Sequence, residues 1–167
     1  MTQSRMKPLA VRRLTAGERG LAAEMFGRGL DAARVRIFAI PVWDRAFVAG
    51  PGLIVWPAAT ARPDFAAADV PLAVQAVFVH ELTHVWQAQN GVWLLAAKLR
   101  AGDSAAAYAY DLAGDSDFAR LNIEQQAMVV EHAFLSLRGV RAQHSPELYA
   151  NARSNWRPGD DDDVAQG

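Results

Sequence analysis

Two histidines and a glutamate in the segment His80-Glu81-Leu82-Thr83-His84 have the types and spacing found in metal-dependent hydrolases. Residues four apart in a helix lie on one face, so His80 and His84 can bind the same metal ion. Zn²⁺ binds imidazole nitrogens at about 2.0–2.1 Å, and a carboxylate beside the ligands can take a proton from the zinc-bound water. The segment therefore predicts a zinc site in which Glu81 is the general base.

A hydrolytic zinc site with two histidines needs one more protein ligand and one open position. The chain has no cysteine, so this ligand must come from histidine or a carboxylate. Glu124 is the candidate, and Glu131, on the same face of the same predicted helix, is the competing carboxylate. Two helical turns separate them by about 10 Å along the axis, so both cannot easily ligate one ion. Either one of these carboxylates binds the metal ion and the other supports a ligand, or neither takes part in the site.

Further polar residues can complete such a site. Gln87, one turn after His84, can contact a substrate or a group behind the ligands, although an ordinary surface glutamine has the same pattern. Stabilisation of a developing oxyanion needs a hydrogen-bond donor, which no motif assigns here. The candidates are His144, Tyr110, Tyr108 and Tyr149. His132, beside Glu131, is expected to be structural or exposed.

Hydrophobic periodicity and turn residues predict the elements that position these side chains. The predicted helices cover residues 16–27, 71–89, 92–99 and 123–137. The predicted strands cover residues 34–40 and 53–56, and the second is expected to be an edge strand that can bind an extended peptide. Residues 108–118 favour a hairpin, but the alanines at 105–107 favour a helix instead.

Length and composition limit the possible functions. With 167 residues and 51% hydrophobic content, the chain is expected to form one core, with an N-terminal extension (1–14), a domain (15–157) and a disordered acidic tail (158–167). The net charge of −1 and the scattered arginines argue against a nucleic-acid partner. No apolar run is long enough to span a membrane, and no signal peptide is recognisable, so a cytoplasmic location is expected.

The segments Phe78–Gln87 and Asn122–Ala127 together resemble a group of small bacterial zincin-like domains similar to gluzincin metallopeptidases. Members of this group are often described as Vgr-related or are found near Rhs and contractile secretion components. The resemblance covers about residues 10–140. It implies an α+β fold with a small sheet packed on an active-site helix and a second ligand-bearing helix. It also implies His80, His84 and Glu124 as zinc ligands, Glu81 as base, and delivery by a specialised secretion system.

One position departs from the thermolysin-like pattern. Where that pattern has an aspartate that supports a zinc-bound histidine, this chain has Met128, so another group must orient the imidazole. Glu131, Asp111 or a main-chain carbonyl can serve. Two functions therefore remain open: a zinc peptidase that hydrolyses peptide or protein substrates, and a non-catalytic zincin-fold adaptor associated with secretion-system proteins.

Overall fold

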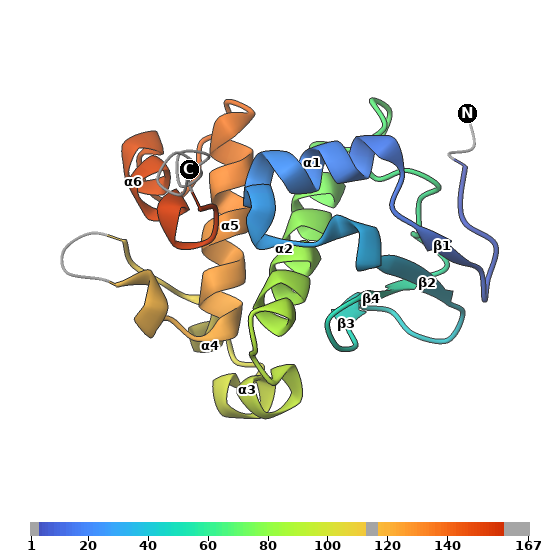
Figure 1. The fold of residues 1–167 in the computed structure, drawn as a ribbon, viewed down its shortest axis with the longest axis horizontal. Coiled ribbons are helices and arrows are strands. Elements are labelled where there is room, and N and C mark those ends of the chain that lie inside the picture. The colour runs from blue at the N-terminus through green and yellow to red at the C-terminus, as the bar shows by residue number, and fades with distance from the viewer. Residues whose placement is uncertain (1–3, 113–116, 159–167) are drawn as a thin grey trace, which may run out of the picture.

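The computed structural model describes residues 4–112 and 117–158. These residues form a mixed α+β fold with a small four-stranded sheet and six α-helices (Figure 1). The strands are β1 (Val11–Arg13), β2 (Arg36–Ile40), β3 (Phe47–Val48) and β4 (Leu53–Pro57). The helices are α1 (Ala16–Phe26), α2 (Leu72–Gln89), α3 (Leu94–Ala101), α4 (Ala105–Tyr108), α5 (Ile123–Leu137) and α6 (Pro146–Ala152). The short 3-10 helices are η1 (Gly27–Gly29), η2 (Ala32–Arg34), η3 (Phe118–Arg120) and η4 (Arg153–Asn155).

The sheet has the strand order β1-β2-β4-β3. β2 and β4 are parallel in its centre, with Ile37 opposite Ile54, and the outer strands β1 and β3 are antiparallel to their neighbours. The prediction that residues 53–56 form an edge strand is therefore wrong, because β3 covers the outer side of β4. Residues 11–13, which the sequence placed in an N-terminal extension, supply the other edge as β1.

The burial of the central strands follows from their neighbours. In β2, Ile37 and Ala39 are fully buried and alternate with more exposed residues, as expected for a strand with one covered face. β4 is buried from Ile54 onwards, as in a strand covered on both faces. Phe65 stacks on Phe78 of α2, with ring centroids 4.9 Å apart, and thereby joins the sheet side of the core to the helix.

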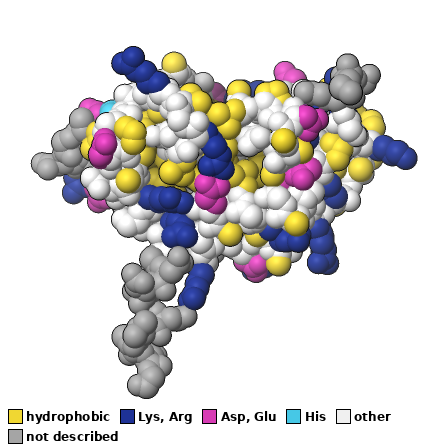
Figure 2. Space-filling view, turned by 90° about the horizontal axis from the view of Figure 1, so that it is seen from above, with side chains coloured by type: hydrophobic (Ala, Val, Ile, Leu, Met, Phe, Trp, Pro, Cys, Tyr) yellow, Lys and Arg dark blue, Asp and Glu magenta, His cyan; other side chains and the backbone are white. Residues whose placement is uncertain are grey.

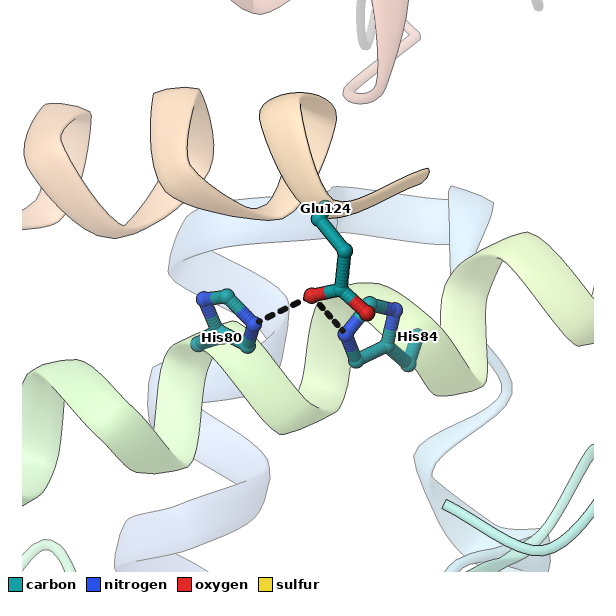
Figure 3. Close-up of side chains that lie close together, drawn as sticks. All are labelled: His80, His84 and Glu124. Carbon is teal, nitrogen blue, oxygen red and sulfur yellow. Dashed lines mark ion pairs between the residues drawn. The ribbon is translucent and has the colours of Figure 1, made fainter. Parts of the chain in front are cut away.

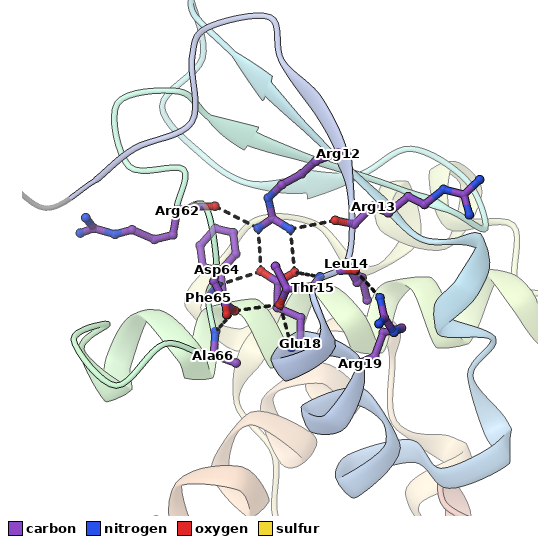
Figure 4. Close-up of polar contacts among 10 residues, drawn as sticks. All are labelled: Arg12, Arg13, Leu14, Thr15, Glu18, Arg19, Arg62, Asp64, Phe65 and Ala66. Carbon is purple, nitrogen blue, oxygen red and sulfur yellow. Dashed lines mark hydrogen bonds and ion pairs between the residues drawn. The ribbon is translucent and has the colours of Figure 1, made fainter.

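β1 is held to α1 by a buried carboxylate. Glu18 completes the capping box of α1 with Thr15 and also accepts two hydrogen bonds of 2.6 Å from the guanidinium of Arg12 (Figure 4). The same carboxylate accepts a 2.8 Å bond from the main chain of Phe65. Glu18 has no exposed surface, so this one side chain joins strand, helix and loop.

α2 and α5 lie side by side and make the most extensive contact between elements (Figure 1). α2 begins after Pro71, and most of its second half is buried on all sides, which is typical of a helix in the centre of a core. α5 begins with a capping box in which Asn122 and Gln125 exchange hydrogen bonds of 2.9 Å. The structure confirms both helices where the hydrophobic periodicity predicts them.

The region between these helices differs in part from the sequence prediction. α3 confirms the expected helix near 92–99, although none of its own residues is buried. The hairpin predicted for 108–118 is wrong for its described part, because residues 105–108 form α4 and residues 118–120 form η3. Residues 113–116 of that prediction lie outside the described residues. The sequence also missed α6, which packs on α5.

The C-terminal segment of the described chain belongs to the core. Trp156 has no exposed surface and lies against Phe118, with ring centroids 5.1 Å apart. Gly29 passes so close to it that a Cβ atom there would come within 2.9 Å of the main-chain oxygen of Trp156. The predicted disordered tail begins two residues later, and its residues 159–167 lie outside the described part of the chain.

The surface carries charges of both signs. On the face shown in Figure 2, basic and acidic side chains are interspersed, and no single basic stripe crosses it. Among the helices of residues 4–112 and 117–158, none combines the length and the apolar character that a membrane crossing requires.

Candidate metal centre

His80, His84 and Glu124 come together where α2 crosses the beginning of α5 (Figure 3). The Oε2 atom of Glu124 lies 3.4 Å from Nε2 of His80 and 3.3 Å from Nε2 of His84. All three side chains are largely enclosed, and Glu124 is only 1% exposed. The two helices thus present two imidazole nitrogens and one carboxylate oxygen to a common point.

The spacing of these atoms fits a zinc ion. Ligands about 2.0–2.1 Å from a tetrahedral centre are themselves about 3.3 Å apart. The two distances to Glu124 match that value. Nitrogen and carboxylate donors of this kind also suit zinc, and the three side chains leave a fourth position of the tetrahedron open. The donor set therefore fits a single zinc ion.

Each histidine ring is oriented by a hydrogen bond at its other nitrogen. Nδ1 of His80 lies 3.0 Å from Oε2 of Glu131, a carboxylate that can only accept, so Nδ1 donates. When the ring is neutral, as metal binding requires, the lone pair is therefore on Nε2, which faces Glu124. Glu131 thus lies behind His80, on the side away from Glu124. It is the carboxylate that orients this imidazole, the role for which position 128, a methionine, has no suitable group.

Gln87 orients the second imidazole. Its amide nitrogen donates to the carbonyl of Ile123 and to the side chain of Gln126, both at 2.9 Å, so its oxygen remains to accept from Nδ1 of His84 at 2.8 Å. Gln87 has no exposed surface and cannot touch a substrate directly. It therefore fixes the ring of His84 and ties that ring to the first turn of α5.

The charges of the cluster shift its pKa values. Burial alone would lower the pKa of His80, but hydrogen bonds with Glu124 and Glu131 outweigh it and raise the pKa to about 9. Burial opposes ionisation of Glu124, yet its hydrogen bonds with His80 and His84 hold the pKa of this carboxyl well below its usual range. Without a metal ion, a positive His80 therefore lies between two carboxylates at neutral pH.

Glu81 lies beside the cluster without taking part in it. The side chain is 6% exposed, and its Oε2 atom is buried with no hydrogen-bond partner among the described residues. Burial raises the pKa of this carboxyl, while the neighbouring histidines oppose the rise. A buried carboxylate oxygen without a partner is costly, unless a water molecule or substrate group occupies the adjacent pocket.

That pocket is polar and has a volume of about 410 Å³. It is lined by the three candidate ligands, which we call the metal cluster although they would hold a single ion, and by Glu81, Lys98 and Tyr108. Nζ of Lys98 lies 3.4 Å from the second oxygen of Glu124. Lys98 was missed by the sequence analysis, because only the fold brings α3 next to the cluster.

Three of the four oxyanion candidates from the sequence, Tyr110, Tyr149 and His144, lie elsewhere. The hydroxyl of Tyr110 is 2.5 Å from Nδ1 of His132 and 2.8 Å from the hydroxyl of Tyr149, and His144 accepts a 3.3 Å bond from the main chain of Leu112. This network joins α5 and α6 and does not line the pocket of the metal cluster. Tyr108 is the one tyrosine among the sequence candidates that does line it.

Comparison with known proteins identifies a homologue. No family model matches the chain. The type VI secretion system spike protein VgrG2b of Pseudomonas aeruginosa is 30% identical in an alignment of 160 residues that covers 90% of this chain and 15% of that protein. The solved effector domain of P. aeruginosa VgrG2b is 29% identical, with 93% of this chain and 88% of that chain covered and a TM-score of 0.66. The chain is homologous to the VgrG2b effector domain.

The match to the VgrG2b effector domain covers nearly the whole of both chains, whereas the chain spans only about a seventh of the whole spike protein. The Vgr-related part of the resemblance seen in the sequence is thereby confirmed. VgrG2b is a component of a secretion system, which also agrees with the expected secretion-system association.

Proposed function

We propose that the chain is a zinc-dependent peptidase domain of the zincin type, with His80, His84 and Glu124 as metal ligands. The observation that carries this proposal is the convergence of three ligand atoms beside Glu81, whose buried Oε2 atom has no hydrogen-bond partner within residues 4–112 and 117–158. A zinc ion bound there supplies Lewis acidity, which lowers the pKa of a water molecule and polarises a peptide carbonyl.

Glu81 is the proposed general base. It accepts a proton from the attacking water and later returns that proton to the leaving amine, so the carboxylate is regenerated. Because burial raises its pKa, the proton affinity of Glu81 is closer to that needed near neutral pH. A purely structural metal site does not need a base beside an open ligand position.

The surrounding residues suggest how a peptide is held. Lys98 and Tyr108 line the pocket and can donate hydrogen bonds to a developing oxyanion. Tyr108 is one of the four residues that the sequence offered for this role, together with Tyr110, Tyr149 and His144. At the sheet edge, Val48 opposes Ile54 between pairs that are hydrogen bonded, as the bond from Ala49 to Leu53 indicates. The main-chain groups of Val48 therefore point away from β4 and can pair with an extended peptide.

Homology to the VgrG2b effector domain supports a role connected with a type VI secretion system. We propose that the chain acts on a peptide or protein substrate in that setting. The alternative is a non-catalytic zincin-fold adaptor, which is favoured by the fact that VgrG2b is itself a spike protein. Glu81 distinguishes the two functions, since an adaptor has no use for a general base.

The deciding experiment replaces Glu81 by glutamine. Glu81→Gln keeps the size of the side chain but cannot accept the proton, so cleavage of a diverse peptide library should fall by about 10²–10⁴-fold while zinc content is unchanged. Glu147→Gln, a change of an exposed carboxylate on α6, is the matched control and should cleave normally. Full cleavage by Glu81→Gln would remove the proposed base. A zinc-loaded wild-type protein that cleaves nothing would favour the adaptor.

A further inference from the structure

The polar pocket meets a second cavity at the metal cluster. This cavity has a volume of about 620 Å³ and lies between residues 43–51 and residues 92–98. The residues that line both cavities mark the junction between them, and they are Arg45, Ala46, His84, Lys98 and Glu124. A substrate whose scissile bond lies at the metal cluster must pass this junction.

The charges at the junction are not balanced once a metal ion is bound. Glu124 is a proposed ligand, so its negative charge then faces the ion. The two remaining charged residues of the junction, Arg45 and Lys98, are both cations. The other carboxylates of the two cavities each line only one of them, and they are Asp44, Glu81, Asp103 and Glu131. The junction therefore has an excess of positive charge in the metal-loaded protein.

Lys98 lies close to the point where the ligand atoms converge. Both imidazoles face the same oxygen of Glu124, Oε2 (Figure 3). The other oxygen, Oε1, is buried without a hydrogen-bond partner in the described part of the chain, and Nζ of Lys98 lies 3.4 Å from it. An extended chain advances about 3.3 Å per residue, so a substrate group bound by Lys98 lies within about two residues of the scissile bond.

Arg45 supplies the second cation from the opposite wall. It belongs to the connection between β2 and β3, whereas Lys98 belongs to α3. Arg45 is exposed and forms no hydrogen bond or ion pair with any residue among 4–112 and 117–158. Two cations that line a common space repel each other, and an anion bound between them replaces this repulsion by attraction. A guanidinium also matches a carboxylate in shape, because it can donate two parallel hydrogen bonds.

We propose that Arg45 and Lys98 bind a carboxylate of the substrate within about two residues of the scissile bond. The proposal rests on the proposed peptidase function and names a class of substrate for it. A peptide offers a carboxylate in two forms, as an aspartate or glutamate side chain or as its free C-terminus. With the first form the chain cuts beside acidic residues, and with the second it removes residues from the C-terminal end.

Three sets of peptides with otherwise equal sequences test this proposal. The first set has a free C-terminus and no acidic residue. The second has an amidated C-terminus and one glutamate, placed at each position in turn, and the third has glutamine instead of that glutamate. Wild type should cut the third set with a kcat/KM roughly 10- to 100-fold below that of the first or the second set, as expected when hydrogen bonds to a charged group are lost. The set that is cut faster identifies the source of the carboxylate.

Arg45 gives the clearest variant, because Lys98 is also a candidate oxyanion donor. Arg45→Gln should abolish most of the preference for a carboxylate, whereas Arg45→Lys should retain most of it, since the charge remains. Arg100→Gln is the control, because Arg100 is an exposed cation of α3 that lines neither cavity. A loss in Arg45→Gln that is equal for all three sets would overturn the assignment, since a group that stabilises an oxyanion acts on every peptide.

Calorimetric binding of the same peptides to the zinc-loaded Glu81→Gln protein separates this proposal from the peptidase proposal. Tighter binding of the carboxylate peptides, lost when Arg45→Gln is added, would support the carboxylate site. If wild type nevertheless cut none of these peptides, only the peptidase would be overturned. Equal or absent binding of all three sets would overturn the carboxylate site, and cleavage by wild type would then still support the peptidase.

Discussion

Gln87 shows how a residue without its own chemistry can decide whether a metal site forms. The two hydrogen bonds that its amide nitrogen donates leave its oxygen as the acceptor of a hydrogen bond from the Nδ1–H group of His84. The tautomer with a free Nε2 is the one that can bind a metal ion. The sequence suggested only that Gln87 lies near the ligands, because its partners on α5 are 36 and 39 residues away.

We therefore expect Gln87→Leu to weaken zinc binding by roughly 10- to 100-fold, the usual effect of losing a group that orients a ligand histidine. Competition with a chromogenic chelator measures this affinity. Gln89→Leu is the control on the same helix, since Gln89 bonds only to the main chain of Asp31 and Pro51. Equal zinc affinity in the two variants would show that Gln87 does not orient His84.

Among the elements, β1 illustrates how a strand of only three residues is kept in place. Its main contact beyond the sheet is the pair between Arg12 and Glu18, in which the carboxylate is fully buried and Arg12 is 19% exposed. A buried pair contributes mainly through the cost of leaving one charge unpaired. The exposed pair between Glu24 and Arg138 has similar geometry but remains in contact with water.

Glu18→Gln should therefore lower the free energy of unfolding by about 3 kcal/mol, because it leaves Arg12 without its counter-charge. Glu24→Gln should cost less than about 1 kcal/mol. Denaturant unfolding of both metal-free variants gives the comparison. The zinc affinity of folded Glu18→Gln should match that of wild type, since neither Arg12 nor Glu18 lines the pocket beside the proposed ligands. Similar losses in both variants would contradict the argument from burial.

The elements also show which features a single sequence can predict. The long helices α2 and α5 were predicted because apolar residues recur at helical spacing over several turns and glycines mark their C-terminal ends. β1 and β3 were missed because strands of three and two residues carry almost no pattern. The edge position was assigned to the wrong strand because strand order depends on pairing between distant segments. The spacing of His80 and His84 is local, whereas the position of Lys98 depends on the packing of α3.

For the molecule as a whole, the proposed metal site joins the two central helices, α2 and α5. An ion that binds only the folded state stabilises it by an amount that depends on the affinity. This stabilisation by a bound ion should depend on pH, because the raised pKa of His80, about 9, lets protons compete with the metal ion for its ring nitrogen. In the metal-free fold, protonated His80 is stabilising below about pH 6.5, and this contribution is lost as the pH rises through about 9.

Zinc should therefore stabilise the protein more at pH 8 than at pH 6. A site that must release a proton with a pKa of about 9 gains about tenfold in affinity per pH unit, or about 2.7 kcal/mol between these two values. This should raise the zinc-dependent shift in Tm by about 5–10 °C. Melting with zinc and with chelator at both pH values measures it.

Two variants complete the melting experiment. Glu124→Ala should lose the zinc-dependent shift at both pH values, because it removes a proposed ligand. Glu131→Gln should keep a shift but lose part of its pH dependence, since a carboxylate that raises the pKa of His80 is gone. A shift in wild type that is the same at pH 6 and pH 8 would be inconsistent with a protonated His80 in the metal-free protein.

α3 places Lys98 beside the proposed ligands, yet none of its residues is buried. The proposed ligands, in contrast, are on the two helices that pack most closely together. Mutations in α3 therefore cost little folding energy, whereas mutations around the ligands cost a great deal. Sequence changes can therefore accumulate in α3 at little cost to the fold, while the helices that carry the proposed ligands tolerate far fewer.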